Sequence, residues 1–265
     1  MVGRRWREFL RDAPAAAHGV QVYEDVGDLA RSVATFLGDG FDSDEPGVLV
    51  ATPAHSGAIL DLLDDTERLL EEGRLVIADA DATLAAFSEA GTPSAAGFER
   101  IVGGLLDGAA GAGRGRRVRV FGEMVDLLVQ RSQPKLAAAL EELWNALMRA
   151  RGDFVLLCGY RLDVFDRNVQ ARAMPDVCRA HSHVQPADDA ARFAQAVDRA
   201  LAEVLGDADA GKVYVCVASD AEKGRVPVAE LALMWVSEHM PAAADRILAS
   251  ARARYRGDPL IPVTA

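Results

Sequence analysis

The stretch GVLVATPAHSG, residues 47–57, decides the fold that the sequence predicts. Its first five residues are apolar throughout, which is typical of a strand buried on both faces of a sheet. A turn at Thr52 and Pro53 follows, and we predict a helix over about residues 55–63. A buried strand that runs directly into a helix indicates one unit of a parallel sheet.

The same alternation of strand and helix continues on both sides of this stretch. Short apolar segments predict further strands at 20–23, 75–77, 117–121 and 154–158. Between them, apolar residues recur at helical spacing, and the Gly- and Ala-rich residues 108–115 are predicted as a surface loop. We therefore predict an α/β fold of three layers, in which a mainly parallel sheet carries helices on both faces.

Two flanking regions differ in pattern from this central part of the chain, residues 18–187. Residues 1–17 form a short head that we expect to be an amphipathic helix, either frayed or docked on the rest of the chain. Residues 188–265 predict a helix, a strand at Val213–Val217 and further helices after Pro227. Because residues 213–217 are apolar throughout, we expect this strand to pair with the main sheet.

Composition limits the classes of function. The chain has 265 residues, of which 29 are basic and 40 acidic, so its formal net charge is −11. This charge disfavours a general nucleic-acid binder. No apolar run approaches the roughly 20 residues that cross a bilayer, and no signal-peptide pattern is present. The three cysteines favour reduced thiols, so we expect a cytoplasmic protein with no membrane contact.

The loop after Ala51 occupies the position of a phosphate-binding loop. It lacks the Gly-Lys-Ser/Thr ending whose lysine neutralises phosphate charge, so we expect no ordinary ATP hydrolysis. A helix N-terminus can still hold an anion through backbone N–H groups. Nucleotide binding thus stays open beside the favoured interpretation, a structural turn.

Glu123 is the second candidate, because ligands of parallel sheets bind at the carboxyl ends of the strands. It follows the predicted strand that ends at Phe121, and Gly122 permits a sharp turn there. We expect its carboxylate at a cavity, partnered by His55 or His18. The alternative is an acid that only stabilises the first turn of the next helix.

A third candidate is a set of cysteines and histidines late in the central region. Cys178 and His181 have the spacing of one helical face, and Cys158 ends a predicted strand. With His183, these four residues are weak candidates for a zinc or other transition-metal site. A buried cysteine with hydrogen-bonded histidines is the favoured alternative, and a reactive thiol is a further one.

From about His18 to Pro186 the chain resembles the MEDS domain, the methanogen/methylotroph DcmR sensory domain. The matching features include Val50-Ala51-Thr52-Pro53, Phe121-Gly122-Glu123-Met124, Leu143-Trp144-Asn145 and Cys158-Gly159-Tyr160. The resemblance implies a sensory domain that recognises small, hydrocarbon-like molecules. It also implies a RecA-like fold derived from P-loop ATPases, here with a degenerate phosphate loop.

Together these observations predict a non-enzymatic sensory or regulatory protein. It would bind a small ligand and signal through contacts with a protein such as a kinase or a transcription regulator, and a homo-oligomer is left open. The alternatives are a nucleotide-binding protein or NTPase, and a metal or thiol redox sensor; no cofactor is required. The candidate ligand-binding residues are His18, Tyr23, Thr52, His55, Asp79, Glu123, Trp144 and Tyr160. For Trp144, a place in the core is the favoured alternative.

Overall fold

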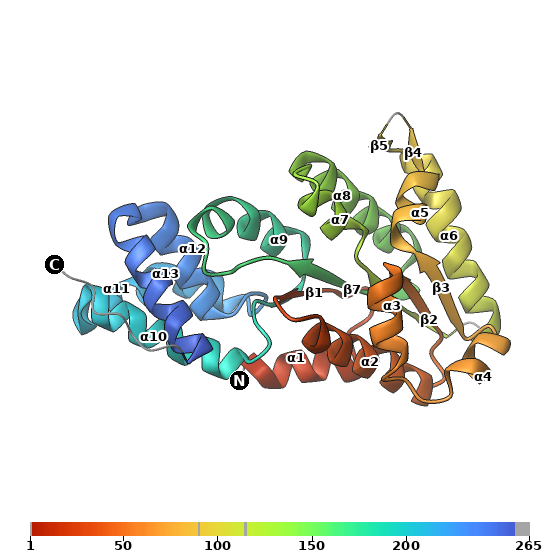
Figure 1. Ribbon diagram of the computed structural model, residues 1–265, viewed down its shortest axis with the longest axis horizontal. Helices are drawn as coiled ribbons and strands as arrows, with labels where there is room; N and C mark the ends of the chain where they lie inside the picture. The colour runs from red at the N-terminus through yellow and green to blue at the C-terminus, as the bar shows by residue number, and fades with distance from the viewer. Residues whose placement is uncertain (1, 90, 114–115, 258–265) are drawn as a thin grey trace.

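The computed structural model describes residues 2–89, 91–113 and 116–257, and it has the predicted α/β architecture (Figure 1). In the described part of the chain, a six-stranded parallel sheet has the order β3-β2-β6-β7-β1-β8. Its strands are β1 (His18–Tyr23), β2 (Gly47–Ala51), β3 (Leu75–Asp79), β6 (Val118–Gly122), β7 (Phe154–Arg161) and β8 (His183–Gln185). A short antiparallel pair joins β4 (Ser88–Glu89) to β5 (Thr92–Pro93).

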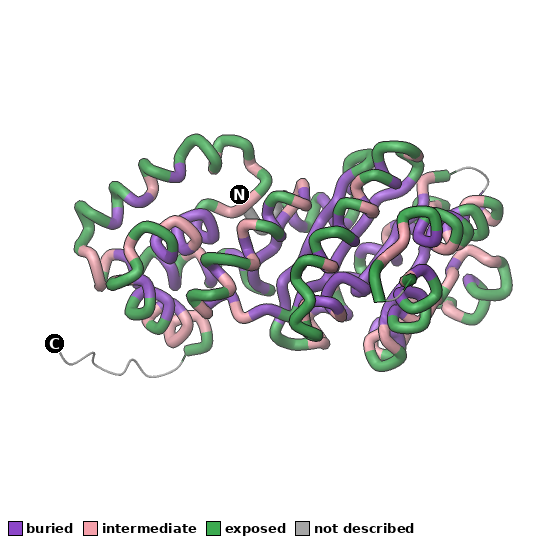
Figure 2. The backbone as a smooth tube through the Cα atoms, turned by 90° about the horizontal axis from the view of Figure 1, so that it is seen from above, coloured by how far each residue is buried: buried purple, intermediate pink, exposed green. Residues whose placement is uncertain are grey.

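Alternation along the strands divides the core into two layers. Val48 and Val50 pack on one side of the sheet, and Leu49 and Ala51 pack on the other. The Leu49 side is covered by α1 (Val2–Arg11), α2 (Val26–Asp42), α3 (Pro53–Leu60) and α4 (Thr66–Glu71). The Val48 side is covered by α5 (Ala80–Ala86), α6 (Ala95–Ala112), α7 (Met124–Gln130), α8 (Pro134–Arg151), the π-helix η1 (Val169–Ala173) and α9 (Met174–Ala180). Figure 2 shows buried residues concentrated in the central strands.

The head is a docked helix, which was one of the two alternatives left open by the sequence. Phe9 of α1 is buried and stacks on Phe36 of α2, with ring centroids 5.9 Å apart. The buried guanidinium of Arg119 on β6 donates hydrogen bonds to the carbonyl oxygens of Leu10 and Phe36. Arg119 therefore ties α1 and α2 to the centre of the sheet.

Two predictions of secondary structure are wrong. Residues 213–217 lie in a helix, α11 (Asp207–Glu222), and pair with no strand. The physical reason is visible in their burial: Val213 and Val217 are buried one helical turn apart, whereas Val215 is 76% exposed. The predicted loop at 108–115 is helical as far as Ala112, because Ala109 is buried in the core; residues 114–115 lie outside the described residues.

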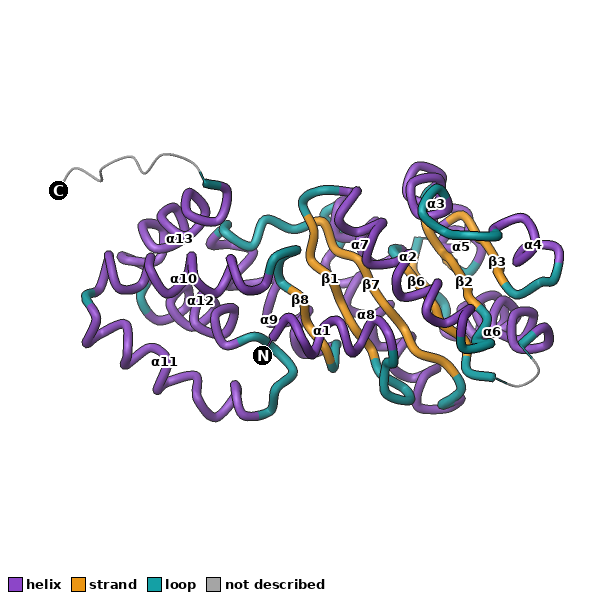
Figure 3. The backbone as a smooth tube through the Cα atoms, turned by 90° about the horizontal axis from the view of Figure 1, so that it is seen from below, coloured by secondary structure: helices purple, strands orange, loops and turns teal. Residues whose placement is uncertain are grey.

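The C-terminal region is a group of helices beyond the edge strand β8 (Figures 1 and 3). It comprises α10 (Ala190–Leu205), α11, α12 (Val228–His239) and α13 (Pro241–Arg256). Its apolar residues continue the core on the Val48 side of the sheet, where Phe193 packs against Phe165 with ring centroids 5.7 Å apart. Among the described residues, no helix is both long and apolar enough to span a membrane.

Candidate functional site

The sheet has a topological switch point between β2 and β6. These strands are neighbours, but the helices that follow them, α3 and α7, leave toward opposite faces of the sheet. Such divergence opens a crevice at the carboxyl ends of the two strands, where α/β proteins commonly bind ligands. The loop after β2 brings Thr52 and His55 to this point, and β6 brings Glu123.

Glu123 is buried at the switch point and connects the two loops. Its Oε1 accepts a short hydrogen bond from the backbone N–H of Thr52, and its Oε2 lies 2.6 Å from Nδ1 of His55. The side chain makes no capping bond to α7, so the carboxylate is not a simple first-turn acid. This confirms His55 as its partner, whereas His18 lies elsewhere. The hydrogen bond that His55 donates to the Glu123 carboxylate raises the pKa of His55 above its usual value.

Tyr23 and Asp126 extend this site. The ring of Tyr23 lies edge-on to the ring of His55, with centroids 6.0 Å apart, and its hydroxyl donates to Oδ2 of Asp126. Asp126 also accepts a hydrogen bond from the backbone N–H of Arg161 at the end of β7. Burial raises the pKa of both Tyr23 and Asp126. We call Tyr23, Thr52, His55, Glu123 and Asp126 the edge cluster.

Sequence reasoning missed Asp126 in the edge cluster. A signal was available, because Asp126 stands three residues after Glu123, one helical turn into the helix after β6. The expectation that Glu123 lines a ligand cavity stays a prediction.

A second polar cluster lies on the sheet face under α8. It contains His18 from β1, Glu141 from α8, Cys158 from β7 and His181 after α9, all of them buried. Burial lowers the pKa of His18 to about 3 and that of His181 to about 4, so both imidazoles are neutral near pH 7. Burial raises the pKa of Glu141 and of Cys158. We call these four residues the face cluster.

Two of the four metal candidates from the sequence, Cys158 and His181, join the face cluster. Cys178 is buried apart from it, and His183 stacks on Phe9 with centroids 5.0 Å apart. The expected shared helical face of Cys178 and His181 is wrong, because α9 ends at Ala180 and His181 has an extended backbone. The metal ligands predicted from the sequence therefore did not include His18 and Glu141. Neither residue is close enough in the sequence to the predicted ligands for spacing to suggest it.

An apolar groove runs between α8 and the segment formed by η1 and α9. It has a volume of about 490 Å³. Its walls include Ala137 and Ala138 of α8 and Val177 of α9, and it reaches Glu141 and Tyr160. The Tyr160 hydroxyl donates a short hydrogen bond to Glu141 Oε1, so the groove borders directly on the face cluster.

Comparison with known families identifies the chain. The family model described as MEthanogen/methylotroph, DcmR Sensory domain (MEDS) matches residues 17–182, more than half of the sequence. The chain belongs to the MEDS family. A search of curated proteins finds no match. MEDS is a sensory domain, which is consistent with a sensory or regulatory role.

The MEDS match spans β1 to α9 and so includes both clusters and the groove. Three predicted ligand residues of this MEDS domain lie outside the clusters. Tyr160 lines the groove and bonds to Glu141 of the face cluster. Trp144 is buried in the core, edge-on to Phe98 at 5.0 Å between centroids, which favours the core interpretation. Asp79 accepts a hydrogen bond from the backbone N–H of Ala82 and so caps α5.

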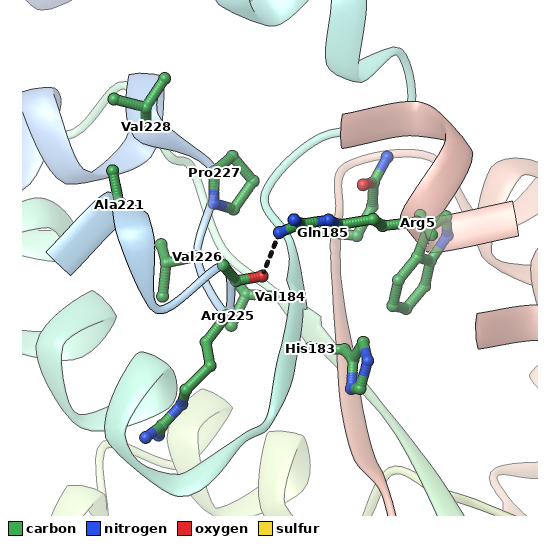
Figure 4. A pocket seen from close by; sticks show the side chains of 11 residues that line it. Arg5, His183, Val184, Gln185, Ala221, Arg225, Val226, Pro227 and Val228 are labelled. Atoms are coloured by element: carbon green, nitrogen blue, oxygen red, sulfur yellow. Dashed lines mark hydrogen bonds between the residues drawn. The ribbon is translucent and has the colours of Figure 1, made fainter. Parts of the chain in front are cut away.

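A smaller cavity lies mostly outside the MEDS match, between α1, β8 and the connection from α11 to α12 (Figure 4). Arg5 Nη1 donates a hydrogen bond of 3.2 Å to the carbonyl oxygen of Gly224 across it. Its volume is about 220 Å³, below the range of about 300–1,000 Å³ that is common for ligand pockets. His183 is the one predicted candidate in its wall.

Proposed function

We propose that this MEDS protein is a non-enzymatic sensor that binds a small apolar molecule in the groove between α8 and α9. The observation that carries this proposal is the groove itself. Its volume of about 490 Å³ lies within the usual range for small-molecule sites, and most of its wall surface is apolar, although charged residues also line it: Lys135, Glu141, Glu142, Arg172, Asp176 and Arg179. The sensory character of the family supports the same conclusion.

The arrangement of helices supports signalling by a packing change. Gln170 in η1 and Met174 in α9 are fully buried and do not line the groove, whereas Ala173 and Val177 of the same segment do. Packing of α12 against η1 connects that wall to the C-terminal helices. We therefore propose that ligand occupancy shifts α9 and changes the surface that a kinase or transcription regulator contacts. The three free cysteines favour a cytoplasmic location for this sensor and its partner.

The other functional hypothesis is a nucleotide-binding protein or NTPase of RecA-like descent. The loop after β2 argues against nucleotide hydrolysis by this chain. Pro53 stands at the start of α3 and has no N–H to offer a phosphate. The N–H of Thr52 already donates to Glu123, whose negative charge would repel a phosphate. We expect no turnover of ATP with magnesium, and turnover that Glu123→Gln abolished would contradict this proposal.

Filling the groove tests ligand binding. Ala138 is exposed and lines the groove, whereas its neighbour Ala139 is exposed and does not. Calorimetric titration of the full chain with benzene and cyclohexane should show binding that Ala138→Trp weakens at least tenfold and Ala139→Trp leaves unchanged. Mass spectrometry of small molecules extracted from the purified protein would identify a natural ligand. Equal affinities in the two tryptophan variants would contradict binding in this groove.

A further inference from the structure

The face cluster brings four different metal-binding side chains to one point. The ligand atoms of His18, Glu141, Cys158 and His181 all lie within 4.8 Å of one another. They come from four separate segments of the chain: β1, α8, β7 and the residue after α9. All four residues are at most 4% exposed. The cluster is therefore held by the tertiary core on every side.

The spacing of these atoms suits a tetrahedral ion. His18 Nε2 lies 3.3 Å from Cys158 Sγ and 3.6 Å from Glu141 Oε2, and His181 Nε2 lies 3.4 Å from Glu141 Oε1. Zinc binds nitrogen and oxygen at about 2.0–2.2 Å and sulfur at about 2.3 Å. Ligand atoms at the corners of such a tetrahedron are about 3.3–3.7 Å apart. The distance from His18 Nε2 to Cys158 Sγ matches such an edge, and each histidine Nε2 lies at a similar distance from one oxygen of Glu141. These are two different oxygens, Oε2 for His18 and Oε1 for His181, so a single metal-bound oxygen supplies one of the two edges as the side chain stands.

Hydrogen bonds fix both imidazoles in the form that binds metal. His181 Nδ1 lies 2.7 Å from the carbonyl oxygen of Val177, which can only accept, so Nδ1 carries the proton. The amide of Asn145 donates to the carbonyl of Ala180 and thereby turns its oxygen toward Nδ1 of His18. Each Nε2 thus presents a lone pair to the cluster. Outer-shell carbonyl partners of this kind are usual for metal-bound histidines.

The cluster also contains polar atoms that its own side chains do not satisfy. Among the described residues, Glu141 Oε2 and His181 Nε2 are buried and have no hydrogen-bond partner. A Cys158 thiol can donate to His18 Nε2, but it leaves these two acceptors without a proton. An unpartnered buried acceptor is destabilising, so two of them in one place indicate a missing positive group.

We propose that His18, Glu141, Cys158 and His181 bind a divalent transition-metal ion of the zinc class. Two imidazoles, one thiolate and one carboxylate are the donors that zinc and similar borderline ions take, whereas magnesium and calcium prefer oxygen alone. On binding, the Cys158 thiol releases its proton to solvent and the sulfur bonds to the ion. Four protein ligands complete a tetrahedral shell, so the ion stabilises the fold at this point and leaves no position for substrate.

The surroundings provide a path for the ion. A cavity of about 330 Å³ is lined by His18, Asn145, His181 and Arg225 and opens on one side of the cluster. The apolar groove reaches Glu141 from the other side. The metal site does not depend on ligand binding in that groove, so Ala138→Trp should leave metal affinity unchanged. Loss of ligand binding with unchanged metal binding, or the reverse, would separate the two proposals.

Cobalt substitution tests the site in the full chain. After chelator treatment, Co²⁺ should bind with one ion per chain and give the strong visible bands of tetrahedral cobalt. It should also give a near-ultraviolet charge-transfer band from the thiolate, and one equivalent of Zn²⁺ should remove all of these bands. Cys158→Ala should abolish the charge-transfer band, and His181→Gln should weaken binding at least tenfold. Cys216→Ser, at an exposed cysteine, is the matched control and should change neither.

Wild-type protein gives an independent measurement if the buried variants fail to fold. X-ray absorption of the zinc-loaded wild-type chain should report one sulfur and three nitrogen or oxygen neighbours. A zinc shell without sulfur, a charge-transfer band that survives in Cys158→Ala, or a folded wild-type chain that binds no Co²⁺ would each overturn the proposal.

Discussion

The pair formed by Glu123 and His55 is the point where two loops of the sheet meet, and it makes stability depend on pH. Glu123 raises the pKa of His55 in the folded protein, so folding favours the protonated imidazole. The stabilisation is complete below the unfolded pKa of about 6.5, and it is lost as pH rises through the higher pKa of the folded state.

Replacement of Glu123 tests this dependence. In Glu123→Gln the pKa of His55 should fall, because its main hydrogen-bond partner loses its charge. The variant should be about 1 kcal/mol less stable than wild type at pH 5.5, and the difference should shrink toward pH 9. Histidine NMR titration and urea unfolding measure the two quantities. Glu67→Gln on exposed α4 is the control, and an unchanged His55 pKa in Glu123→Gln would contradict the pairing.

At the scale of elements, Arg119 links the head to the sheet. Its guanidinium is 1% exposed, pairs with the Glu45 carboxylate at 2.6 Å, and donates to the carbonyl oxygens of Leu10 and Arg11 at the end of α1. A buried charge with this many partners positions a helix as well as stabilising it, since each of those carbonyls would otherwise lack a donor.

Removal of this charge should release α1. Arg119→Met removes the donor to the carbonyl oxygens of Leu10 and Arg11 and to Oε2 of Glu45, whose Oε1 keeps its bond from Arg117. The loss of one partner of a buried pair costs about 3–5 kcal/mol. We expect a lower free energy of unfolding in urea and faster hydrogen exchange in α1 than in α8. Arg100→Met, at an exposed position of α6, should have little effect on either measurement. Unchanged exchange in α1 would show that apolar contacts of Phe9 hold the head without Arg119.

At the scale of the whole molecule, the C-terminal helices complete the core. Phe165, which follows β7, lies 5.7 Å from Phe193 of α10 and 5.6 Å from Tyr255 of α13, between ring centroids. The apolar residues of these helices belong to the same cluster as the residues on the Val48 side of the sheet. The MEDS match ends before this region, yet the packing of the domain depends on it.

Truncation after Ala187 should therefore destabilise the remaining chain. A fragment of residues 1–187 would expose Phe165 and neighbouring apolar surface, at a cost of roughly 25 cal/mol per Å². We expect it to bind the dye anilinonaphthalene sulfonate and to unfold at a lower urea concentration than the full chain. A stable fragment with the full-length unfolding midpoint would instead show that residues 188–265 form a separate module.

Local pattern was enough for five of the six strands of the described sheet and for part of the edge cluster, whereas the short edge strand β8 was not predicted. Apolar runs such as residues 47–51 predicted the buried strands, because burial on both faces requires apolar side chains at consecutive positions. Glu123 was predicted at the sheet edge with His55 or His18 as its partner, because parallel strands bring the loops at their carboxyl ends to one edge. The structure selects His55. These inferences need only the chain neighbours of each residue.

The tertiary structure decided what depends on distant segments. The run at 213–217 suits a strand or a helix equally, and packing beside α10 and α12 selected the helix. The face cluster joins His18 to Cys158, 140 residues away, and to Glu141, one of two adjacent acidic residues in its helix. Sequence spacing cannot predict a contact between residues so far apart, because strand order and helix placement are set by the burial of the whole core.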